Sequence, residues 1–283
     1  FTTDSKKLRF RWVPYSAGLS MDHMPSTGVS GIDIYRFDAA KGKWLYYKTG
    51  RIWQPKKGGS LDIPWTPGTP CLVNLPLYNG VKSFALGIDK DAFVRALPPR
   101  KSGVTKPVVF YGTSTTQGGC VTRPGHCWTT IASRIADVPQ VNLGFSGSGK
   151  MEDVMLDRVA ALDASAYVLD TIGNMPPALI DARYEKFVRG LREKRPETPI
   201  VLTANGWLFR DDPRERARRI KAIYAKLKAE DPVKWRNLHF VGDYGADVAP
   251  DAEGTMDGVH PNDEAFANMT KKLTPILRAA LKQ

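Results

Sequence analysis

The chain has 283 residues, of which 42% are hydrophobic and 25% charged, a composition typical of one large globular domain or two ordinary ones. It contains no run of 18 apolar residues, so we expect no membrane-spanning helix. The net charge is +12, and residues 183–236 contain 16 Lys and Arg against 8 Asp and Glu. This stretch could attract an anionic glycan, but solvated helix faces are the interpretation we favour. It lacks the aromatic interleaving of a nucleic-acid platform, so no nucleic-acid partner is expected.

The first third of the chain has the pattern of short β-strands. Residues 9–13 and 31–37 alternate polar and apolar side chains, and a turn at 38–42 precedes a return strand. Asn79-Gly80 lies between two apolar runs and predicts a β-hairpin. Frequent Pro and Gly between such runs predict a β-sandwich, jelly-roll-like accessory domain over residues 1–97. The charged segment 98–106, which contains Pro and Gly, is then a linker.

From residue 107 onward, short apolar runs alternate with helical patterns. Apolar residues recur at helical spacing in 184–191 and 220–227, and a final helix is expected over about 263–281. Pro213 is suited to begin the helix before residue 220, because the first helical position needs no N–H. The alternation predicts an α/β domain over 107–283, with a parallel sheet covered on both faces. Its five strands are expected at 108–111, 140–143, 166–169, 200–204 and 238–241.

Three polar blocks follow the first three of these runs, at the strand ends where open α/β sheets bind ligands. Ser114 offers a hydroxyl nucleophile, and Gly147 offers a backbone N–H that no Cβ obstructs. Asn174 offers an uncharged amide donor. Donors of this kind stabilise an oxyanion. Each block alone also fits an ordinary polar turn.

A fourth block, Asp257-Gly258-Val259-His260, precedes the final helix. A turn at Gly258 would bring the Asp257 carboxylate to His260 Nδ1, which would leave Nε2 to accept a serine proton. The four blocks together predict acyl transfer through Ser114, with no metal or cofactor. No Cys or His cluster has the spacing of metal ligands. His239 lies within an apolar run, so we expect it to be a core residue and not the base.

The cysteines leave one alternative open. Cys120 and Cys127 could pair, leaving Cys71 single, but three buried thiols are the outcome we favour.

Residues 144–151 suggest a competing function, because Gly-Phe-Ser-Gly-Ser-Gly-Lys-Met nearly matches a phosphate-binding P-loop. Met151 occupies the position where that motif needs a hydroxyl to hold magnesium. Nucleotide hydrolysis is therefore disfavoured.

Taken in order, the blocks resemble those of the SGNH (GDSL-type) hydrolases, a family named for its Ser, Gly, Asn and His. Residues 31–35, Gly-Ile-Asp-Ile-Tyr, are similar to the Gly-x-Asp-Leu-Tyr signature of a β-sandwich that precedes one SGNH subgroup. Residues 112–120 and 142–147 are similar to that subgroup's first two blocks. The resemblance covers nearly the whole chain and implies a flavodoxin-like fold for the second domain.

The resemblance also implies the role of each site residue. Ser114 would be the nucleophile, His260 the general base and acid, and Asp257 the group that orients it. The Ser114 N–H, the Gly147 N–H and the Asn174 side chain would form the oxyanion hole. Two departures affect substrate choice: the first block reads Gly-Thr-Ser and not Gly-Asp-Ser, and Met175 replaces an acid that often follows the Asn.

The function expected is therefore a serine carboxylic-ester hydrolase, and removal of acetyl groups from a carbohydrate is the reaction we favour. The appended sandwich and its tryptophans motivate the carbohydrate substrate. A short-chain lipase or thioesterase would use the same site. A non-catalytic carbohydrate-binding protein is a further alternative. The absence of Met at the start and the polymeric substrate suggest a secreted or periplasmic protein.

Overall fold

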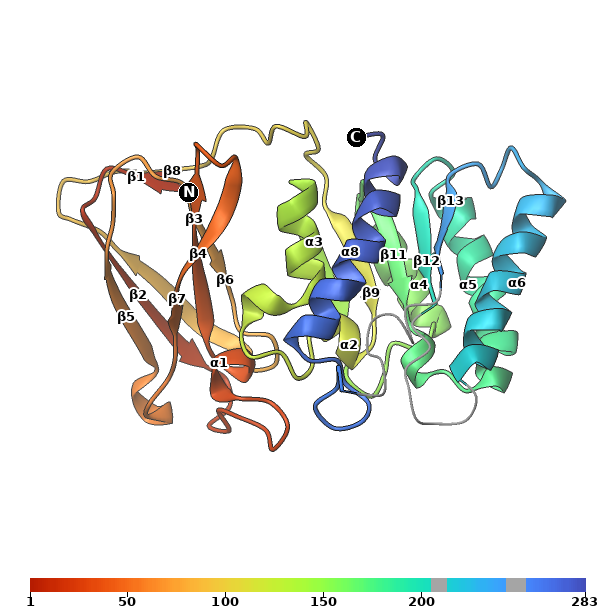
Figure 1. Ribbon diagram of the computed structural model, residues 1–283, viewed down its shortest axis with the longest axis horizontal. Helices are drawn as coiled ribbons and strands as arrows, with labels where there is room; N and C mark the ends of the chain where they lie inside the picture. The colour runs from red at the N-terminus through yellow and green to blue at the C-terminus, as the bar shows by residue number, and fades with distance from the viewer. Residues whose placement is uncertain (205–212, 243–252) are drawn as a thin grey trace. The chain divides into compact units, whose positions relative to one another are not determined.

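The structure, a computed structural model, describes residues 1–204, 213–242 and 253–283 (Figure 1). The chain forms two compact units. The first contains Phe1–Arg100 and Cys120–Cys127, and the second contains Lys101–Gly119 and Trp128–Gln283. The segment Cys120–Cys127 lies inside the hydrolase domain expected from the sequence, yet it groups with the first unit. The chain therefore leaves the second unit once, shortly after Ser114, and returns to it at Trp128.

The first unit is a β-sandwich, as the alternating sequence predicts. Its core contains apolar side chains of both three-stranded sheets, including Phe10 and Trp12 from one and Ile34 from the other. The first sheet contains β5 (Gly59–Pro64), β2 (Lys7–Pro14) and β7 (Val81–Gly87), in that order and all antiparallel. The second contains β4 (Lys43–Gly50), β3 (Ile32–Asp38) and β6 (Cys71–Asn74), also antiparallel. The short elements of the unit are β1 (Thr2–Thr3), β8 (Val94–Arg95), α1 (Ser26–Val29), η1 (Pro55–Lys57) and η2 (Pro124–His126).

The hairpin predicted at Asn79-Gly80 is wrong, because β6 and β7 belong to different sheets. Asn79 is 5% exposed and its side chain binds backbone groups far away in sequence. Its Oδ1 accepts from Ser16 N–H at 3.0 Å, and its Nδ2 donates to the carbonyls of Ser16 at 3.0 Å and Gly18 at 3.2 Å. The amide thus anchors a crossing between sheets, where a two-residue turn would have returned the chain to the same sheet.

The second unit is built on a five-stranded parallel sheet with strand order β10-β9-β11-β12-β13. This order is the flavodoxin-like one, so the predicted fold class is confirmed. The strands lie close to the runs read from the sequence: β9 (Val108–Gly112), β10 (Gln140–Gly144), β11 (Ala166–Asp170), β12 (Ile200–Thr203) and β13 (Leu238–Val241). The three central strands β9, β11 and β12 are buried along their whole length, as strands covered on both faces are.

Helices cover both faces of this sheet (Figure 1). Contacts between α3 (Trp128–Ala136) and α8 (Asp263–Ala280) form one layer, and α5 (Pro177–Lys194) contacts both α4 (Asp153–Ala161) and α6 (Pro213–Glu230) in the other. The short elements α2 (Ser114–Gln117) and η3 (Ile172–Asn174) follow β9 and β11. The predicted helix start at Pro213 is confirmed. Within the described ranges, no helix is long and apolar enough to cross a membrane.

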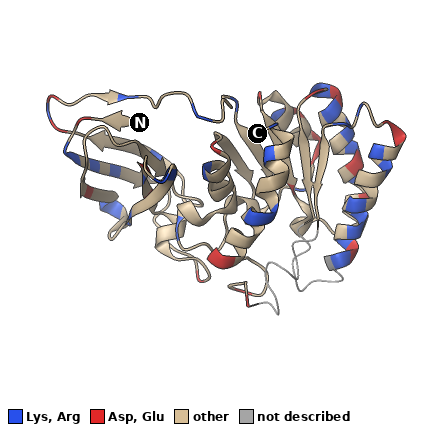
Figure 2. Cartoon of the chain, turned by 45° about the horizontal axis from the view of Figure 1, so that its top comes forward, with Lys and Arg blue, Asp and Glu red and all other residues tan. Residues whose placement is uncertain are grey.

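The basic stretch of residues 183–236 forms ion-paired helix faces. Lys and Arg lie together with Asp and Glu on α5 and α6 (Figure 2). This pairing supports the interpretation that the stretch consists of solvated helix faces. The pairs include Arg189–Glu185, Arg189–Glu230, Arg219–Asp181, Arg219–Glu215 and Lys226–Glu185.

All three cysteines lie in the described ranges, and each is a buried thiol without a disulfide. Burial raises the pKa of the Cys71 thiol to about 12, so it is not a nucleophile at neutral pH.

Candidate active site

Ser114 lies two residues beyond the end of the buried strand β9 and is the first residue of helix α2. The Thr113 hydroxyl caps α2 by accepting from the Thr115 N–H at 3.3 Å. Gly112 is required at the strand end, because a Cβ there would lie 2.1 Å from Thr116 Oγ1. Ser114 is 8% exposed. Its own N–H is in the first turn of α2, where N–H groups have no acceptor within the helix.

His260 and Asp257 share a tight loop before α8. The loop is closed by hydrogen bonds from Met256 N–H to the His260 carbonyl at 3.0 Å and from Asn262 N–H to the Gly254 carbonyl at 2.8 Å. Gly258 has a φ of +78°, which permits the turn between the acid and the imidazole. This is the turn that the sequence predicts.

The Asp257 carboxylate holds His260 through both of its oxygens. Oδ1 accepts from the backbone N–H of Val259 at 3.0 Å and of His260 at 2.7 Å, and Oδ2 lies 2.7 Å from His260 Nδ1. Partial burial opposes ionisation, but these hydrogen bonds outweigh it and hold the pKa of Asp257 below its usual range.

The ionised carboxylate fixes the tautomer of His260. A carboxylate only accepts hydrogen bonds, so the proton on the imidazole lies on Nδ1 and Nε2 carries the lone pair. Ser114 Oγ lies 2.8 Å from that Nε2. The serine hydroxyl can therefore donate its proton to the imidazole along an existing hydrogen bond.

The two remaining predicted donors lie at neighbouring strand ends. Gly147 is exposed in the loop after β10, with a φ of +71°, and within the described residues its N–H donates no hydrogen bond. The Asn174 side chain donates through Nδ2 to the Ser148 carbonyl at 2.7 Å. An amide nitrogen carries two hydrogens, so this bond anchors the Asn174 side chain and leaves one hydrogen to donate.

Strand order explains why these residues gather. Ser114 follows β9, Gly147 follows β10 and Asn174 follows β11, and β9 lies between the other two strands. The direction of the strand order reverses at this point, and doubly wound sheets place ligand sites outside the carboxyl ends of the strands there. The structure thus brings Ser114, His260 and Asp257 into one hydrogen-bonded series, and the other two donors lie at the same edge of the sheet.

Two supporting groups are not among the residues predicted for the site. Asp170, 2% exposed at the end of β11, accepts from Thr116 Oγ1 at 2.7 Å and from Thr203 Oγ1 at 2.9 Å, which ties α2 to β11 and β12. Arg216 on α6 is 8% exposed and donates to the carbonyls of Ile172 and Gly173, both at 3.3 Å, beside Asn174. The position of Asp170 at the end of an apolar run could have identified it from the sequence. Arg216 could not have been identified, because it is one of many Lys and Arg residues in a strongly basic stretch.

The loop that resembles a P-loop does not present its N–H groups to a phosphate. Met151 is 1% exposed, with its side chain in the core. A phosphate cradle needs several N–H groups that converge on one anion. Here five of them bind within the protein: Phe145 to the Gly112 carbonyl, Ser146 to Gln117 Oε1, Ser148 to the Phe145 carbonyl, Lys150 to Glu152 Oε2 and Met151 to the Tyr111 hydroxyl.

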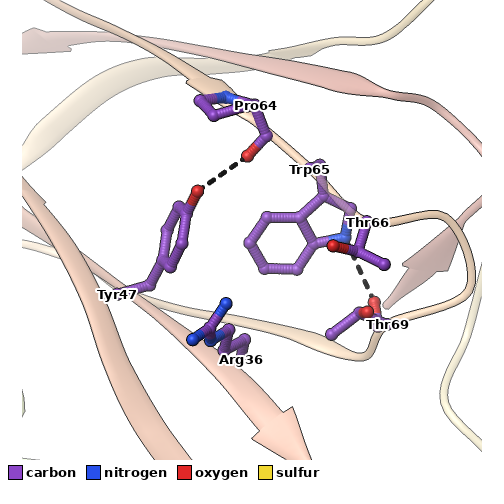
Figure 3. Close-up of a pocket in the computed structure, with 6 residues that line it drawn as sticks. All are labelled: Arg36, Tyr47, Pro64, Trp65, Thr66 and Thr69. Carbon is purple, nitrogen blue, oxygen red and sulfur yellow. Dashed lines mark hydrogen bonds between the residues drawn. The ribbon is translucent and has the colours of Figure 1, made fainter.

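A small pocket in the first unit carries different chemistry (Figure 3). It is lined by six residues, among them Tyr47 on β4 and Trp65, whose rings meet edge to face with 5.5 Å between their centres. The Arg36 guanidinium lies 5.2 Å from the centre of the Tyr47 ring and forms no ion pair with any described carboxylate.

Comparison with known proteins gives matches over both units. The family model of the GDSL-like lipase/acylhydrolase family matches residues 105–278. The GxDLY model, which describes the N-terminus of SGNH-hydrolase-type esterases, matches residues 1–94. A search of curated proteins found no match.

Solved structures of similar fold come from several kinds of protein. A candidate GDSL-like lipase from Bacteroides ovatus is 30% identical with a TM-score of 0.83, over 99% of this chain and 83% of that one. A salicylyl-acyltransferase of a tetracycline biosynthetic pathway is 16% identical with a TM-score of 0.67, over 98% and 80% of the two chains. A family two carbohydrate esterase from Clostridium thermocellum, in complex with cellohexaose, is 10% identical with a TM-score of 0.67, over 99% and 91%.

Proposed function

The chain belongs to the GDSL-like lipase/acylhydrolase family, and from that premise we propose that it hydrolyses carboxylic esters through an acyl-enzyme on Ser114. The observation that carries the proposal is the series from Ser114 Oγ to His260 Nε2, at 2.8 Å, and from His260 Nδ1 to Asp257 Oδ2, at 2.7 Å. Such a series activates a weak hydroxyl nucleophile by supplying a base that is itself oriented by an anion.

In the acylation step, Ser114 Oγ attacks the ester carbonyl carbon while His260 Nε2 takes the hydroxyl proton. The electron pair of the carbonyl bond moves to the oxygen, and the resulting oxyanion accepts from the N–H groups of Ser114 and Gly147 and from Asn174 Nδ2. Collapse of the intermediate breaks the bond to the leaving alcohol, which receives the proton from Nε2. Asp257 stabilises the imidazolium that exists between these transfers.

In the deacylation step, water replaces the alcohol. His260 Nε2 takes a proton from the water as its oxygen attacks the acyl carbon, and the same donors hold the second oxyanion. Collapse then breaks the bond to Ser114 Oγ, which regains its proton from Nε2. The products are the free carboxylic acid and the starting enzyme.

The substrate we propose is an acetylated carbohydrate. The fold shared with family two carbohydrate esterases supports it, as does the Trp53 ring of the first unit, which is 74% exposed. The reaction would then act on a polymer, and we propose an extracellular or periplasmic location on that ground. A short-chain lipase or thioesterase would use the same residues and differ only in the acyl and alcohol groups accepted.

Replacement of Ser114 tests the nucleophile. The Ser114→Ala protein is assayed on p-nitrophenyl acetate and on acetylated oligosaccharides, and the wild type is mixed with a fluorophosphonate probe. We expect loss of turnover in the variant and labelling of wild-type Ser114 alone. Ser146→Ala is the matched control, because it removes an exposed hydroxyl from the loop after β10 and should leave both readouts unchanged. Turnover by Ser114→Ala equal to wild type would exclude the proposed mechanism.

A panel of esters separates the substrate classes. Acyl chains of increasing length are compared on one alcohol, and acetyl groups are compared on sugars and on simple alcohols. Acetylated sugars should give the highest kcat/KM. A preference for long acyl chains would favour the lipase, and a preference for thioesters the thioesterase.

We also propose that the pocket of the first unit binds an acidic sugar unit of the same glycan. Arg36 supplies a charge that no described carboxylate neutralises, and guanidinium groups bind carboxylates in a bidentate geometry. Tyr47 and Trp65 also line the pocket and offer aromatic side chains to a sugar ring (Figure 3).

Calorimetric titration of the full-length chain checks this second role. Uronic-acid oligosaccharides should bind the wild type, and Arg36→Ala should weaken that binding without affecting ester hydrolysis of p-nitrophenyl acetate. Arg51→Ala is the control, because Arg51 lies over the Trp53 ring outside the pocket. The proposed acidic-sugar site would be ruled out if the wild type bound acidic and neutral oligosaccharides equally well and Arg36→Ala bound both as well as the wild type does.

A further inference from the structure

The signature residues of the first unit bind a segment that continues directly from the nucleophile helix. Helix α2 begins at Ser114 and ends at Gln117. The chain then enters the first unit as Cys120–Cys127 and resumes in the second unit as α3. We call Cys120–Cys127 the return segment.

Asp33 holds the return segment through a fully buried carboxylate. Its Oδ2 accepts from Arg123 Nη1 at 2.8 Å and from the Gly125 N–H at 2.8 Å, while Oδ1 accepts from Thr49 Oγ1 at 2.6 Å. The Asp33 side chain is 0% exposed and that of Arg123 is 17% exposed. A buried carboxylate needs this set of charged and backbone partners, because burial without them would be strongly unfavourable.

Tyr35, on the same strand as Asp33, also binds Arg123 of the return segment. Arg123 Nη1 also donates to the Tyr35 hydroxyl at 2.7 Å, and the guanidinium stacks 4.1 Å from the centre of the Tyr46 ring. Asp33 and Tyr35 raise the pKa of Arg123 against the opposing effect of burial, so the cation persists. Gly125 must lack a side chain, since a Cβ would lie 2.4 Å from the Tyr35 hydroxyl.

Both ends of the return segment are connected to α2. At its start, Gly118 and Gly119 join it to the helix, and their N–H groups donate to the Ser114 carbonyl at 3.0 and 2.8 Å. At its far end, Trp128 begins α3, and its indole N–H donates to the Thr115 carbonyl at 3.0 Å. A shift of the return segment would therefore act on the two residues that start α2.

We propose that Asp33 and Arg123 are positioning residues for the nucleophile: by fixing the return segment, they hold α2 and thus Ser114 Oγ in place for His260. This inference depends on the proposed function only in taking Ser114 as the nucleophile. The sandwich would then contribute to catalysis by positioning the nucleophile, in addition to any binding of glycan. It also explains the Asp and Tyr of the signature, because both side chains meet on one guanidinium.

Kinetics of Asp33→Asn test the proposal. The amide keeps the shape of the carboxylate but removes the charge that holds Arg123. Misplacement of a reacting atom by about 1 Å can cost 10²-fold, so we expect kcat to fall by roughly tenfold to 10²-fold with KM nearly unchanged. Asp62→Asn is the matched control, because Asp62 forms an exposed ion pair with Arg9 in the same sandwich at 2.5 Å.

A double-mutant cycle separates positioning from general stability. Arg123→Gln and the double variant Asp33→Asn/Arg123→Gln are measured beside Asp33→Asn. If the two residues act through each other, the double variant should lose no more kcat than either single one. Arg123→Lys should recover part of the loss, because it keeps the charge but not the planar fork. Multiplying losses in the double variant would overturn the proposal.

Hydrogen exchange gives a readout that does not require activity. In Asp33→Asn, amides of residues 114–128 should exchange faster than in wild type, whereas in Asp62→Asn they should not. Wild-type kcat together with unchanged exchange in this region would overturn the proposal. If the wild type itself neither hydrolyses esters nor reacts with a fluorophosphonate, the proposed function fails, and the exchange data alone decide on the positioning. Should Asp33→Asn fail to fold, Tyr35→Phe and Arg123→Lys carry the same two measurements.

Discussion

Ser114 Oγ lies 2.8 Å from His260 Nε2 although 146 residues separate them in the chain. Packing of α3 against α8 brings together the segments that hold Ser114 and His260. Trp128, the first residue of α3, bonds to the Thr115 carbonyl of α2, and His260 lies three residues before α8. The pairing therefore depends on two helices of one layer.

Replacement of His260 should remove the base from this pair. His260→Gln keeps a polar side chain but cannot take and return a proton, so kcat should fall by about 10⁴- to 10⁶-fold. Fluorophosphonate labelling of Ser114 should fall in parallel, since it needs the same activated hydroxyl. His239→Gln serves as the control, because His239 lies in β13, where burial lowers its pKa and keeps it neutral. Comparable activity in His260→Gln and wild type would contradict the assignment.

Asp257→Asn should separate orientation of the imidazole from proton transfer. The amide can present a hydrogen to Nδ1 and so favour the wrong tautomer, and we expect kcat to fall by about 10²- to 10⁴-fold. KM should stay near the wild-type value, since both oxygens of Asp257 are held by Val259 and His260. Initial rates over a range of p-nitrophenyl acetate concentrations give both constants. A variant whose only defect is a raised KM would show that Asp257 binds substrate instead.

The pKa of Asp257 also predicts how stability changes with pH. Its folded-state pKa lies below the ordinary value of 3.8, because His260 and Val259 donate to the charged form. The carboxylate therefore stabilises the fold fully above about pH 4 to 5 and loses that contribution as the pH falls through the folded-state pKa. Urea unfolding of wild type and Asp257→Asn should show a difference at pH 7 that shrinks at pH 3. A difference that grows on acidification would have the wrong sign.

Asn174→Ala should weaken the oxyanion hole without removing the nucleophile. One donor lost from such a site costs about 10²- to 10³-fold in kcat. Asn174 also bonds to the Ser148 carbonyl, so Asn174→Asp is a useful second variant: it cannot donate and adds a negative charge. We expect Asp to be worse than Ala in single-turnover assays. Equal activity of Asn174→Ala and wild type would remove Asn174 from the oxyanion hole.

Much of the second unit was predictable from sequence because its strands are short, continuous and buried. Each observed strand lies within a residue or so of its apolar run, and α8 begins at the predicted Asp263. The order of the strands could not be read from the runs themselves. It came from the resemblance to a family, whereas the apolar runs themselves predicted that Ser114, Gly147 and Asn174 lie at strand ends.

The features that sequence reasoning missed depend on contacts between distant residues. Asn79-Gly80 fits a hairpin locally, but the Asn79 amide binds Ser16 and Gly18, which no local rule anticipates. Cys120–Cys127 groups with the first unit, to which it is joined by long-range contacts that include the buried ion pair between Asp33 and Arg123, 90 residues apart. Local patterns predict elements, whereas such pairs decide where the chain crosses between units.

From the buried hydrogen bond between Thr203 and Asp170 we predict an effect of mutation on the free energy of unfolding. Thr203 is 0% exposed, and its hydroxyl donates to Asp170 Oδ1 at 2.9 Å, while Oδ2 accepts from Thr116 of α2. Thr203→Val keeps the shape but leaves one oxygen of a buried carboxylate without this donor, which should lower the free energy of unfolding by about 1–3 kcal/mol. Urea unfolding measures the loss, with the exposed Thr66→Val as control. Because Asp170 also anchors α2, kcat should fall slightly in Thr203→Val and not in Thr66→Val. Equal stability of Thr203→Val and wild type would mean that Asp170 does not depend on this hydroxyl.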